Sequence, residues 1–223
     1  MFETRYPFKL LYKPHPRFAV DPGNAALLVL DAQRLTMDTE GAFARLARLK
    51  GVEAEFKYYY ASLKEATPKM AELLTGCREA GTRVVFTRIA PVDENPDGFM
   101  SRLDGVDSRQ EDAEIIEALT PLTGEAVIDR QCENPFNCAG FVEALNEMNP
   151  RFLILCGVRT PGTLNRVALD AVDRGIGVIV ASDASAGGVP RGLINLPGGM
   201  IKVRKTEAIL QMLSETVTGG AGQ

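Results

Sequence analysis

Five short runs of apolar residues, separated by longer segments with helical periodicity, constrain the fold of this chain more than any other feature. The runs show almost no alternation of polar and apolar residues, as expected of strands buried on both faces of a parallel sheet. They cover residues 26–30, 82–87, 126–128, 152–156 and 177–181, and residues 200–203 form a weaker sixth candidate. Strands of this kind require covering layers on both sides.

The segments between the runs supply those layers, because their apolar residues recur at helical spacing. Helices are predicted within residues 56–74, 141–148, 164–172 and 207–216. Pro68 is expected to kink or divide the first of them. Strands that alternate with helices favour βαβ units. The sequence therefore predicts an α/β fold: a single three-layer domain with a mostly parallel sheet of about six strands and helices on both faces.

The length of 223 residues suits one domain. Residues 1–24 predict an N-terminal arm whose many apolar side chains pack on the body or on a neighbouring subunit. Residues 25–217 are predicted to form the α/β domain and residues 218–223 a flexible tail. Residues 91–110 lack any period, and either a binding loop or a simple surface excursion would explain them. We expect a homo-oligomer or a subunit of an assembly.

The charge balance argues against several classes of partner. Lys and Arg number 25 against 29 Asp and Glu, a net charge of −4, which does not suit nucleic acid or an anionic membrane. No apolar stretch approaches the roughly 20 residues of a membrane span, and the N-terminus does not resemble a secretory signal. The four cysteines show no CxxC spacing. We therefore expect a cytoplasmic protein with reduced thiols.

Polar side chains stand at the predicted carboxyl ends of three strands. Asp31 follows the first strand, Arg130 follows the third, and Thr163 belongs to the turn at 157–163 that follows the fourth. Ligands of open parallel sheets bind beyond these strand ends. The sequence therefore predicts that a carboxylate, a guanidinium and a hydroxyl meet around a small-molecule ligand.

The turn at 157–163 has features of a helix start. Thr160 suits the N-cap and Pro161 the first helical position, which would place Thr163 in the first turn. Backbone N–H groups and the helix dipole would there stabilise a carbonyl oxygen that gains negative charge. The alternative, in which the Thr163 hydroxyl merely caps the backbone, stays open.

Four stretches, LLVLDAQ, AVIDRQ, GVRTPGTLNRVALDAVDRG and VIVASDASAG, follow a known pattern. That pattern has a strand ending in Asp-x-Gln, a strand ending in Lys, and a Gly-Val-x-Thr-x-x-Cys turn that opens a helix. The chain thus resembles the isochorismatase-like (cysteine hydrolase) superfamily over residues 25–212. The resemblance implies the α/β fold predicted above and a site for small molecules at the carboxyl edge of the sheet.

The resemblance also implies roles for individual residues. In the family the cysteine is the nucleophile, the aspartate is its base, and the lysine orients and polarises. By position Asp31 matches the aspartate, whereas Arg130 stands in place of the lysine and Thr163 in place of the cysteine. Oxyanion, backbone or substrate-binding positions would be Gln33, Arg159, Thr160 and Gly162. A non-prolyl cis peptide, usual in the family, would fall between Val158 and Arg159.

These departures alter the expected chemistry. A threonine hydroxyl ionises far less readily than a thiol, and Arg130, with a pKa above about 12, cannot shuttle protons. A nucleophile relocated to Cys132 or Cys138 is a further alternative, although neither has an evident base. The resemblance also bears on metals, because a metal-bound, nicotinamidase-type site in the family needs histidines after the second strand. The stretch that follows this strand here, TRIAPVDENPDG, contains no histidine. We therefore expect no metal and no other cofactor.

Three hypotheses for the function remain open. The first, which we favour, is a pseudoenzyme or non-catalytic subunit that keeps the pocket. The second is hydrolysis of a small amide or ureide by Thr163 or an activated water. The third is protonation of a vinyl ether by Asp31, as the resemblance implies for isochorismatases proper, which lack the cysteine. An Asp31–Arg130 pair closed on itself would favour the first, an open pocket with a water the second, and an apolar setting for Asp31 the third.

Overall fold

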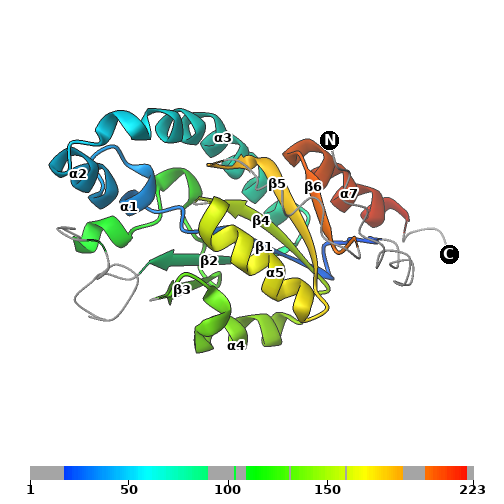
Figure 1. Cartoon of the computed structure of the whole chain (residues 1–223). Helices are drawn as coiled ribbons and strands as arrows, with labels where there is room; N and C mark the ends of the chain where they lie inside the picture. Colours follow the sequence, from blue (N-terminus) through cyan, green and yellow to red (C-terminus); the bar gives the residue numbers. More distant parts are fainter. Residues whose placement is uncertain are drawn as a thin grey trace, which may run out of the picture.

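The apolar runs form one sheet in the computed structural model, which describes residues 18–89, 103, 109–130, 132–158, 160–187 and 199–219, with backbone alone for 160, 161 and 216–219. The strands are β1 (Ala25–Leu30), β2 (Arg83–Ile89), β3 (Ala126–Arg130), β4 (Phe152–Gly157), β5 (Gly177–Ser185) and β6 (Ile201–Arg204). They lie in the order β3-β2-β1-β4-β5-β6, and every neighbouring pair is parallel. The predicted α/β fold is thus confirmed (Figure 1).

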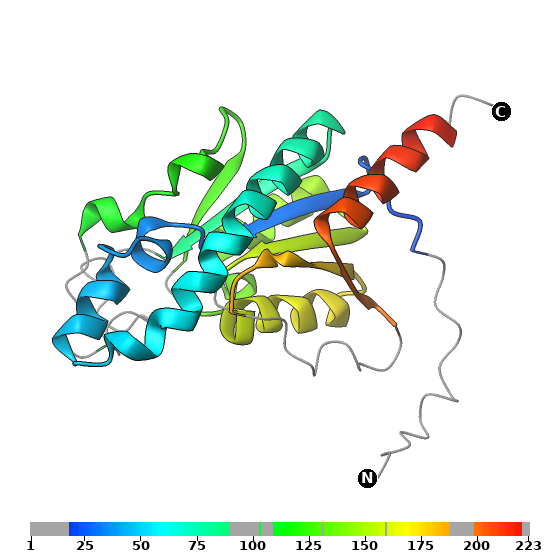
Figure 2. The ribbon, with the colours of Figure 1, turned by 90° about the horizontal axis from the view of Figure 1, so that it is seen from above.

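Helices cover both faces of the sheet. α3 (Lys57–Glu79) and α7 (Thr206–Gly219) lie side by side on one face, while α4 (Ala139–Met148) and α5 (Asn165–Asp173) lie on the other (Figure 2). α1 (Arg34–Met37) and α2 (Ala42–Leu49) follow β1 and were not predicted from the sequence. Short 3₁₀ turns connect other elements: η2 (Glu53–Phe56), η5 (Gln110–Ala113), η6 (Glu117–Leu119) and η7 (Pro135–Asn137).

The central strand β1 shows why these strands are apolar throughout. Leu27 and Val29 pack in the core on the side of α3 and α7, whereas Leu28 and Leu30 pack in the core on the side of α4 and α5. Every residue of β1 is at most 1% exposed. Because helices cover both faces, alternate side chains enter two different cores, and neither set of positions favours polar residues.

α3 runs without interruption through Pro68. The proline therefore does not divide the helix, and a kink at Pro68 stays a prediction. Leu63 precedes the proline and Met70 and Leu74 follow it, and all three are buried against the sheet. Packing on both sides thus outweighs the cost of about 3 kcal/mol that a proline imposes inside a helix.

Several sequence predictions concern residues outside the described ranges. They are the arm up to residue 17, the loop at 91–110 apart from residues 103, 109 and 110, and the chain beyond residue 219. Of the arm, Phe18 packs its ring on Phe152, with ring centroids 5.2 Å apart. Within the described ranges, no helix has the length and apolar character needed to cross a membrane.

Candidate functional site

Asp31 directly follows β1 and adopts a left-handed backbone conformation, with φ of 50°. Three hydrogen bonds hold this conformation. The Asp31 N–H donates to the carbonyl of Thr87 at 3.0 Å, and the Asp31 carbonyl accepts from the Gln33 N–H at 2.9 Å and from the Thr36 hydroxyl at 2.7 Å. A left-handed non-glycine residue costs roughly 1–2 kcal/mol and is typical of functional sites.

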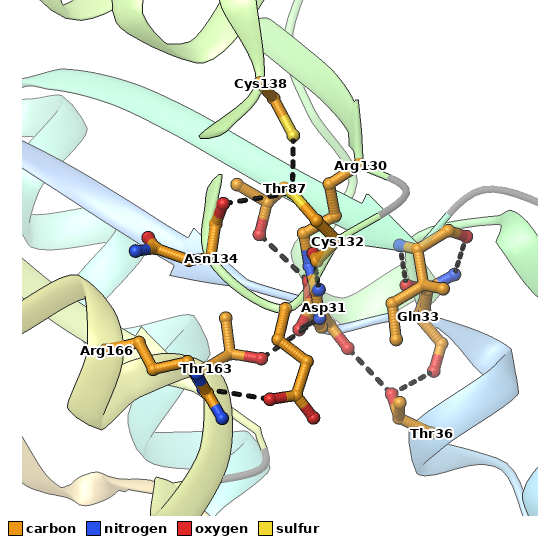
Figure 3. Close-up of polar contacts among 12 residues, drawn as sticks. Asp31, Gln33, Thr36, Thr87, Arg130, Cys132, Asn134, Cys138, Thr163 and Arg166 are labelled. Carbon is orange, nitrogen blue, oxygen red and sulfur yellow. Dashed lines mark hydrogen bonds and ion pairs between the residues drawn. The ribbon is translucent and has the colours of Figure 1, made fainter. Parts of the chain in front are cut away.

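Three hydrogen-bond donors from neighbouring side chains contact the Asp31 carboxylate (Figure 3). Arg130, the last residue of β3, reaches past β2 and donates from Nε to Oδ1 at 2.7 Å and from Nη2 to Oδ2. The Thr87 hydroxyl of β2 donates to Oδ1 at 3.0 Å. Both side chains of the ion pair are 0% exposed. The result is a bidentate, buried pair that closes on itself.

Arg130 is held by further contacts. Its Nη1 donates to the carbonyl of Cys132, and its Nη2 also donates to the Thr163 hydroxyl at 3.1 Å. Burial acts to lower the pKa of Arg130, but the charge of Asp31 and its hydrogen bonds outweigh this effect and raise the pKa above the ordinary value. The guanidinium therefore stays protonated.

Thr163 lies where the sequence placed it relative to the other two residues, although the helix begins differently. Residues Thr160–Leu164 form a single turn of π-helix, and α5 starts only at Asn165. The prediction that Thr163 lies in the first turn of an α-helix is therefore wrong. A wide turn of this kind is frequent at functional sites. It brings the buried Thr163 hydroxyl to Arg130, and half-buried Gly162 lies beside it.

The remaining predictions for this turn fall outside what the structure describes. Arg159 is not among the described residues, so neither its side chain nor the Val158–Arg159 bond can be placed. For Thr160 the backbone alone is described, within the π-helical turn. The roles predicted for Arg159, Thr160 and Gly162 therefore stay predictions.

Gln33 makes structural contacts at both ends of its amide. Its Oε1 accepts from the Ile89 N–H at 2.6 Å, and its Nε2 donates to the carbonyls of Ile89 at 3.1 Å and Asp112 at 3.3 Å. The side chain is fully buried. These contacts tie the segment after β1 to the end of β2 and to η5, which favours a positioning role over direct substrate contact.

Replacing Gln33 by Ala is expected to lower the free energy of unfolding by about 2 kcal/mol or more, because the Ile89 N–H and C=O lose their partner in the interior. Urea unfolding measures this change. The matched control is Gln211→Ala on α7, whose exposed amide donates to Glu215 and whose loss should cost under about 0.5 kcal/mol. Equal effects of the two substitutions would contradict the role given to Gln33.

Gly157 ends β4 and brings it unusually close to β1. Its φ is 123°, and a Cβ added there would lie 2.2 Å from the Leu30 carbonyl oxygen. The same carbonyl accepts from the Val158 N–H at 2.9 Å. A glycine at this position therefore lets the turn that carries Thr163 dock against the strand that carries Asp31.

The four cysteines are free thiols. Cys77 and Cys156 are buried in the core, and burial raises the pKa of Cys77 to about 12. Cys132 lies beside the site, where burial and a contact with Cys138 raise its pKa to about 11. Because a thiol with such a pKa is scarcely ionised near pH 7, this environment weighs against Cys132 as a relocated nucleophile.

Sequence reasoning missed two polar residues at the same edge of the sheet. Thr87 supplies a hydroxyl to Asp31, and Ser185, at the end of β5, has a buried hydroxyl without a partner among the described residues. Ser185 pairs in register with Gly157. Thr87 ends the apolar run 82–87 of the sequence, which is the signal that could have identified it, whereas Ser185 lies four residues beyond the run 177–181 and has no such signal.

A cavity of about 470 Å³ lies elsewhere, at the amino ends of β4 and β5. Phe152 and Gly177, the first residues of these strands, line it together with Arg174, Phe136 and Leu145. It is therefore at the opposite edge of the sheet from Asp31. Across the described part of the chain, no three side chains of His, Cys, Asp or Glu gather in a way that suits a metal ion.

A parallel sheet whose carboxyl edge gathers a buried carboxylate, guanidinium and hydroxyl defines the class: an α/β protein with a polar cluster at that edge. Comparison with known proteins identifies the family. Residues 25–192 match the model of the Isochorismatase domain. The chain belongs to the isochorismatase family.

Individual relatives agree with this assignment. The secreted isochorismatase effector Isc1 of Verticillium dahliae is 28% identical over 149 residues, which cover 67% of this chain and 74% of the relative. A cysteine hydrolase from Pseudomonas syringae pv. phaseolicola superposes with a TM-score of 0.71 at 23% identity, covering 91% of this chain and 98% of that one. N-carbamoylsarcosine amidase from Thermoplasma acidophilum gives 0.64 at 18%, covering 82% and 97%. These two structures share the fold.

Proposed function

We propose that this isochorismatase-family protein binds a small molecule at the carboxyl edge of its sheet without thiol catalysis, as a pseudoenzyme or a non-catalytic subunit. The closed Asp31–Arg130 pair carries the proposal. A general base must lie within hydrogen-bond reach of the proton that it removes. Here Arg130 pairs with both Asp31 oxygens, and among the described contacts the Thr163 hydroxyl meets this guanidinium at 3.1 Å and not the carboxylate.

The contacts of Arg130 also bear on the class of ligand. Asp31, Cys132 and Thr163 together accept from four of the five N–H groups of this guanidinium. Little capacity remains for an anionic group of a ligand. The proposal therefore favours a neutral ligand, such as an amide or ureide, held by hydroxyls and by backbone N–H groups of the turn before α5.

One alternative is catalysis that needs no thiol, with Asp31 acting on a vinyl ether. The curated relative named as an isochorismatase supports it. The paired state of Asp31 weighs against it, because a carboxylate that already accepts from Arg130 and Thr87 is poorly placed to donate a proton. Hydrolysis by Thr163 or by a water is a further alternative. It would need Asp31 as the base, and both oxygens of Asp31 already accept from Arg130.

Location and assembly are part of the proposal. We infer a cytoplasmic protein, supported by the four free cysteines, with a secreted location as the alternative that the name of the Verticillium relative offers. We also infer a homo-oligomer or a subunit of a larger assembly, with neither nucleic acid nor a membrane as a partner. The acidic net charge supports the latter two exclusions.

The test restores the residues that the family pattern has. The wild type should release neither ammonia from N-carbamoylsarcosine nor pyruvate from isochorismate, and blocking its cysteines should change nothing. In the double variant Thr163→Cys with Arg130→Lys, the new thiol should lie beside Asp31 and a cation. Its pKa should fall below about 8.5, so that iodoacetamide labels it near pH 7 faster than it labels Cys77. Labelling rates against pH, with sites assigned by mass spectrometry, measure this.

Each outcome bears on the proposal. Turnover of either substrate by the wild type would overturn the pseudoenzyme assignment, and pyruvate release would establish the vinyl ether alternative. Activity that is lost when Cys132 or Cys138 is alkylated would instead point to a relocated nucleophile. A new thiol that titrates near 8.5 would show that the geometry around Asp31 no longer supports a thiolate.

A further inference from the structure

Two half-buried thiols face each other beside the candidate site. The Sγ atoms of Cys132 and Cys138 are 3.3 Å apart, and the Cys132 thiol also contacts the carbonyl of Asn134 at 3.1 Å (Figure 3). Cys132 follows β3, and Cys138 is the N-cap residue of α4. A disulfide has an S–S distance of about 2.05 Å. The two sulfurs therefore need to approach by little more than 1 Å.

The loop between the two thiols is connected to the site and to α5. The Cys132 carbonyl accepts from Arg130, the Asn134 side chain donates to Asp170 of α5, and Glu133 forms an ion pair with Arg166 of α5 at 2.9 Å. η7 closes the loop, with the Asn134 side chain accepting from the Phe136 N–H at 3.2 Å. A covalent link across this loop would therefore fix the carbonyl that helps to hold Arg130.

We propose that Cys132 and Cys138 are a redox modification site, which forms a reversible intramolecular disulfide with a small disulfide such as oxidised glutathione as the oxidant. One thiolate attacks a sulfur of oxidised glutathione, forms a mixed disulfide and releases one reduced glutathione. The second thiol loses its proton, attacks the protein sulfur of the mixed disulfide and releases a second reduced glutathione. The two cysteines together lose two electrons and two protons, which the oxidant takes up.

The surroundings of Cys132 and Cys138 set the rate at which the disulfide forms. Burial and the contact with Cys138 raise the pKa of Cys132 to about 11, although the charge of Arg130 acts in the opposite direction. Since the thiolate is the attacking species, oxidation through Cys132 should accelerate as the pH rises from 7 to 9. The other two cysteines provide an internal comparison, because both are fully buried in the core.

The experiment equilibrates the full chain with mixtures of reduced and oxidised glutathione at pH 8, followed by acid quenching, alkylation and tryptic digestion. Cleavage after Arg130 and Arg151 gives one peptide, residues 131–151, that contains both thiols. We expect this peptide to lose two hydrogen masses and both alkylation sites as the oxidised fraction rises. Cys77 and Cys156 should stay reduced, and added dithiothreitol should reverse the change.

Cys132→Ser and Cys138→Ser are the matched variants, and Cys77→Ser is the control that should behave as the wild type. Each matched variant should carry at most one glutathione adduct and should never show the loss of two hydrogen masses. Amide exchange across residues 132–138 should slow on oxidation of the wild type but not of either matched variant. A peptide that stays reduced in pure oxidised glutathione, that carries two separate adducts, or that links to another chain would overturn the proposal.

Discussion

Replacing Asp31 by Asn is expected to lower the free energy of unfolding by about 3–5 kcal/mol, because the change leaves Arg130 as an unpaired buried charge. Asn has the size of Asp and tolerates a left-handed backbone, so the φ of 50° at this position should not add a separate cost. Both partners are 0% exposed, and no solvent can replace the lost carboxylate. Urea unfolding followed by circular dichroism measures the difference.

A matched control exists on the neighbouring strand. Asp129 precedes Arg130 in β3 and pairs with Arg88, but these two side chains are 48% and 34% exposed. Asp129→Asn should therefore cost under about 1 kcal/mol. In the double variant of Asp31→Asn with Arg130→Met, an apolar side chain replaces the unpaired buried charge of Arg130, and part of the lost stability should return. Equal losses for Asp31→Asn and Asp129→Asn would refute the importance given to the buried pair.

Gly157→Ala is the second substitution for which we expect a large effect, a loss of about 3 kcal/mol or more. The new Cβ would lie 2.2 Å from the Leu30 carbonyl oxygen and 2.7 Å from the Leu30 nitrogen, and the φ of 123° disfavours any side chain. Relief requires β1 and β4, two central strands, to separate. The loss should appear as a lower melting temperature and a lower urea midpoint.

Gly140→Ala is the control for this substitution. Gly140 is exposed in α4, and a Cβ there would have no neighbour within 4 Å. Alanine also favours helix over glycine by up to about 1 kcal/mol. Gly140→Ala should therefore leave stability unchanged or raise it slightly. If Gly157→Ala were equally harmless, the close approach of β4 to β1 would not be a constraint on this fold.

The strands could be predicted because both sheet faces are buried. Runs such as 152–156 carry almost no polar residue, and each predicted run overlaps a strand, although β2 begins one residue later than predicted, at Arg83, and β6 begins at Ile201. The helices after β1 could not be predicted in the same way. α1 has only four residues, and α2 depends on a distant residue, Asp112, which accepts from the Ala42 N–H at 3.1 Å and pairs with Arg45 at 2.7 Å. Short segments with such long-range partners carry little local signal.

The candidate site could be predicted in part, because strand order in a parallel sheet brings strand ends together. Asp31, Arg130 and Thr163 do meet at the carboxyl edge. The sequence raised an Asp31–Arg130 pair closed on itself as one of several outcomes, but it could not show that Arg130 donates to both oxygens of Asp31. The π-helical turn before α5 was also missed, because Thr-Pro-Gly-Thr satisfies the preferences of an ordinary helix start.

The placement of the buried ion pair has a consequence for the order in which the chain folds. Asp31 and Arg130 are 99 positions apart in the sequence, and β2 separates their strands in the sheet. The pair can close only after three strands have found their register, and contacts that require such long loops form late. Its contribution should therefore be absent from the rate-limiting barrier of folding, so that it slows unfolding without speeding folding. For this chain, the pair would form after the main folding barrier and lower the rate at which the native state unfolds.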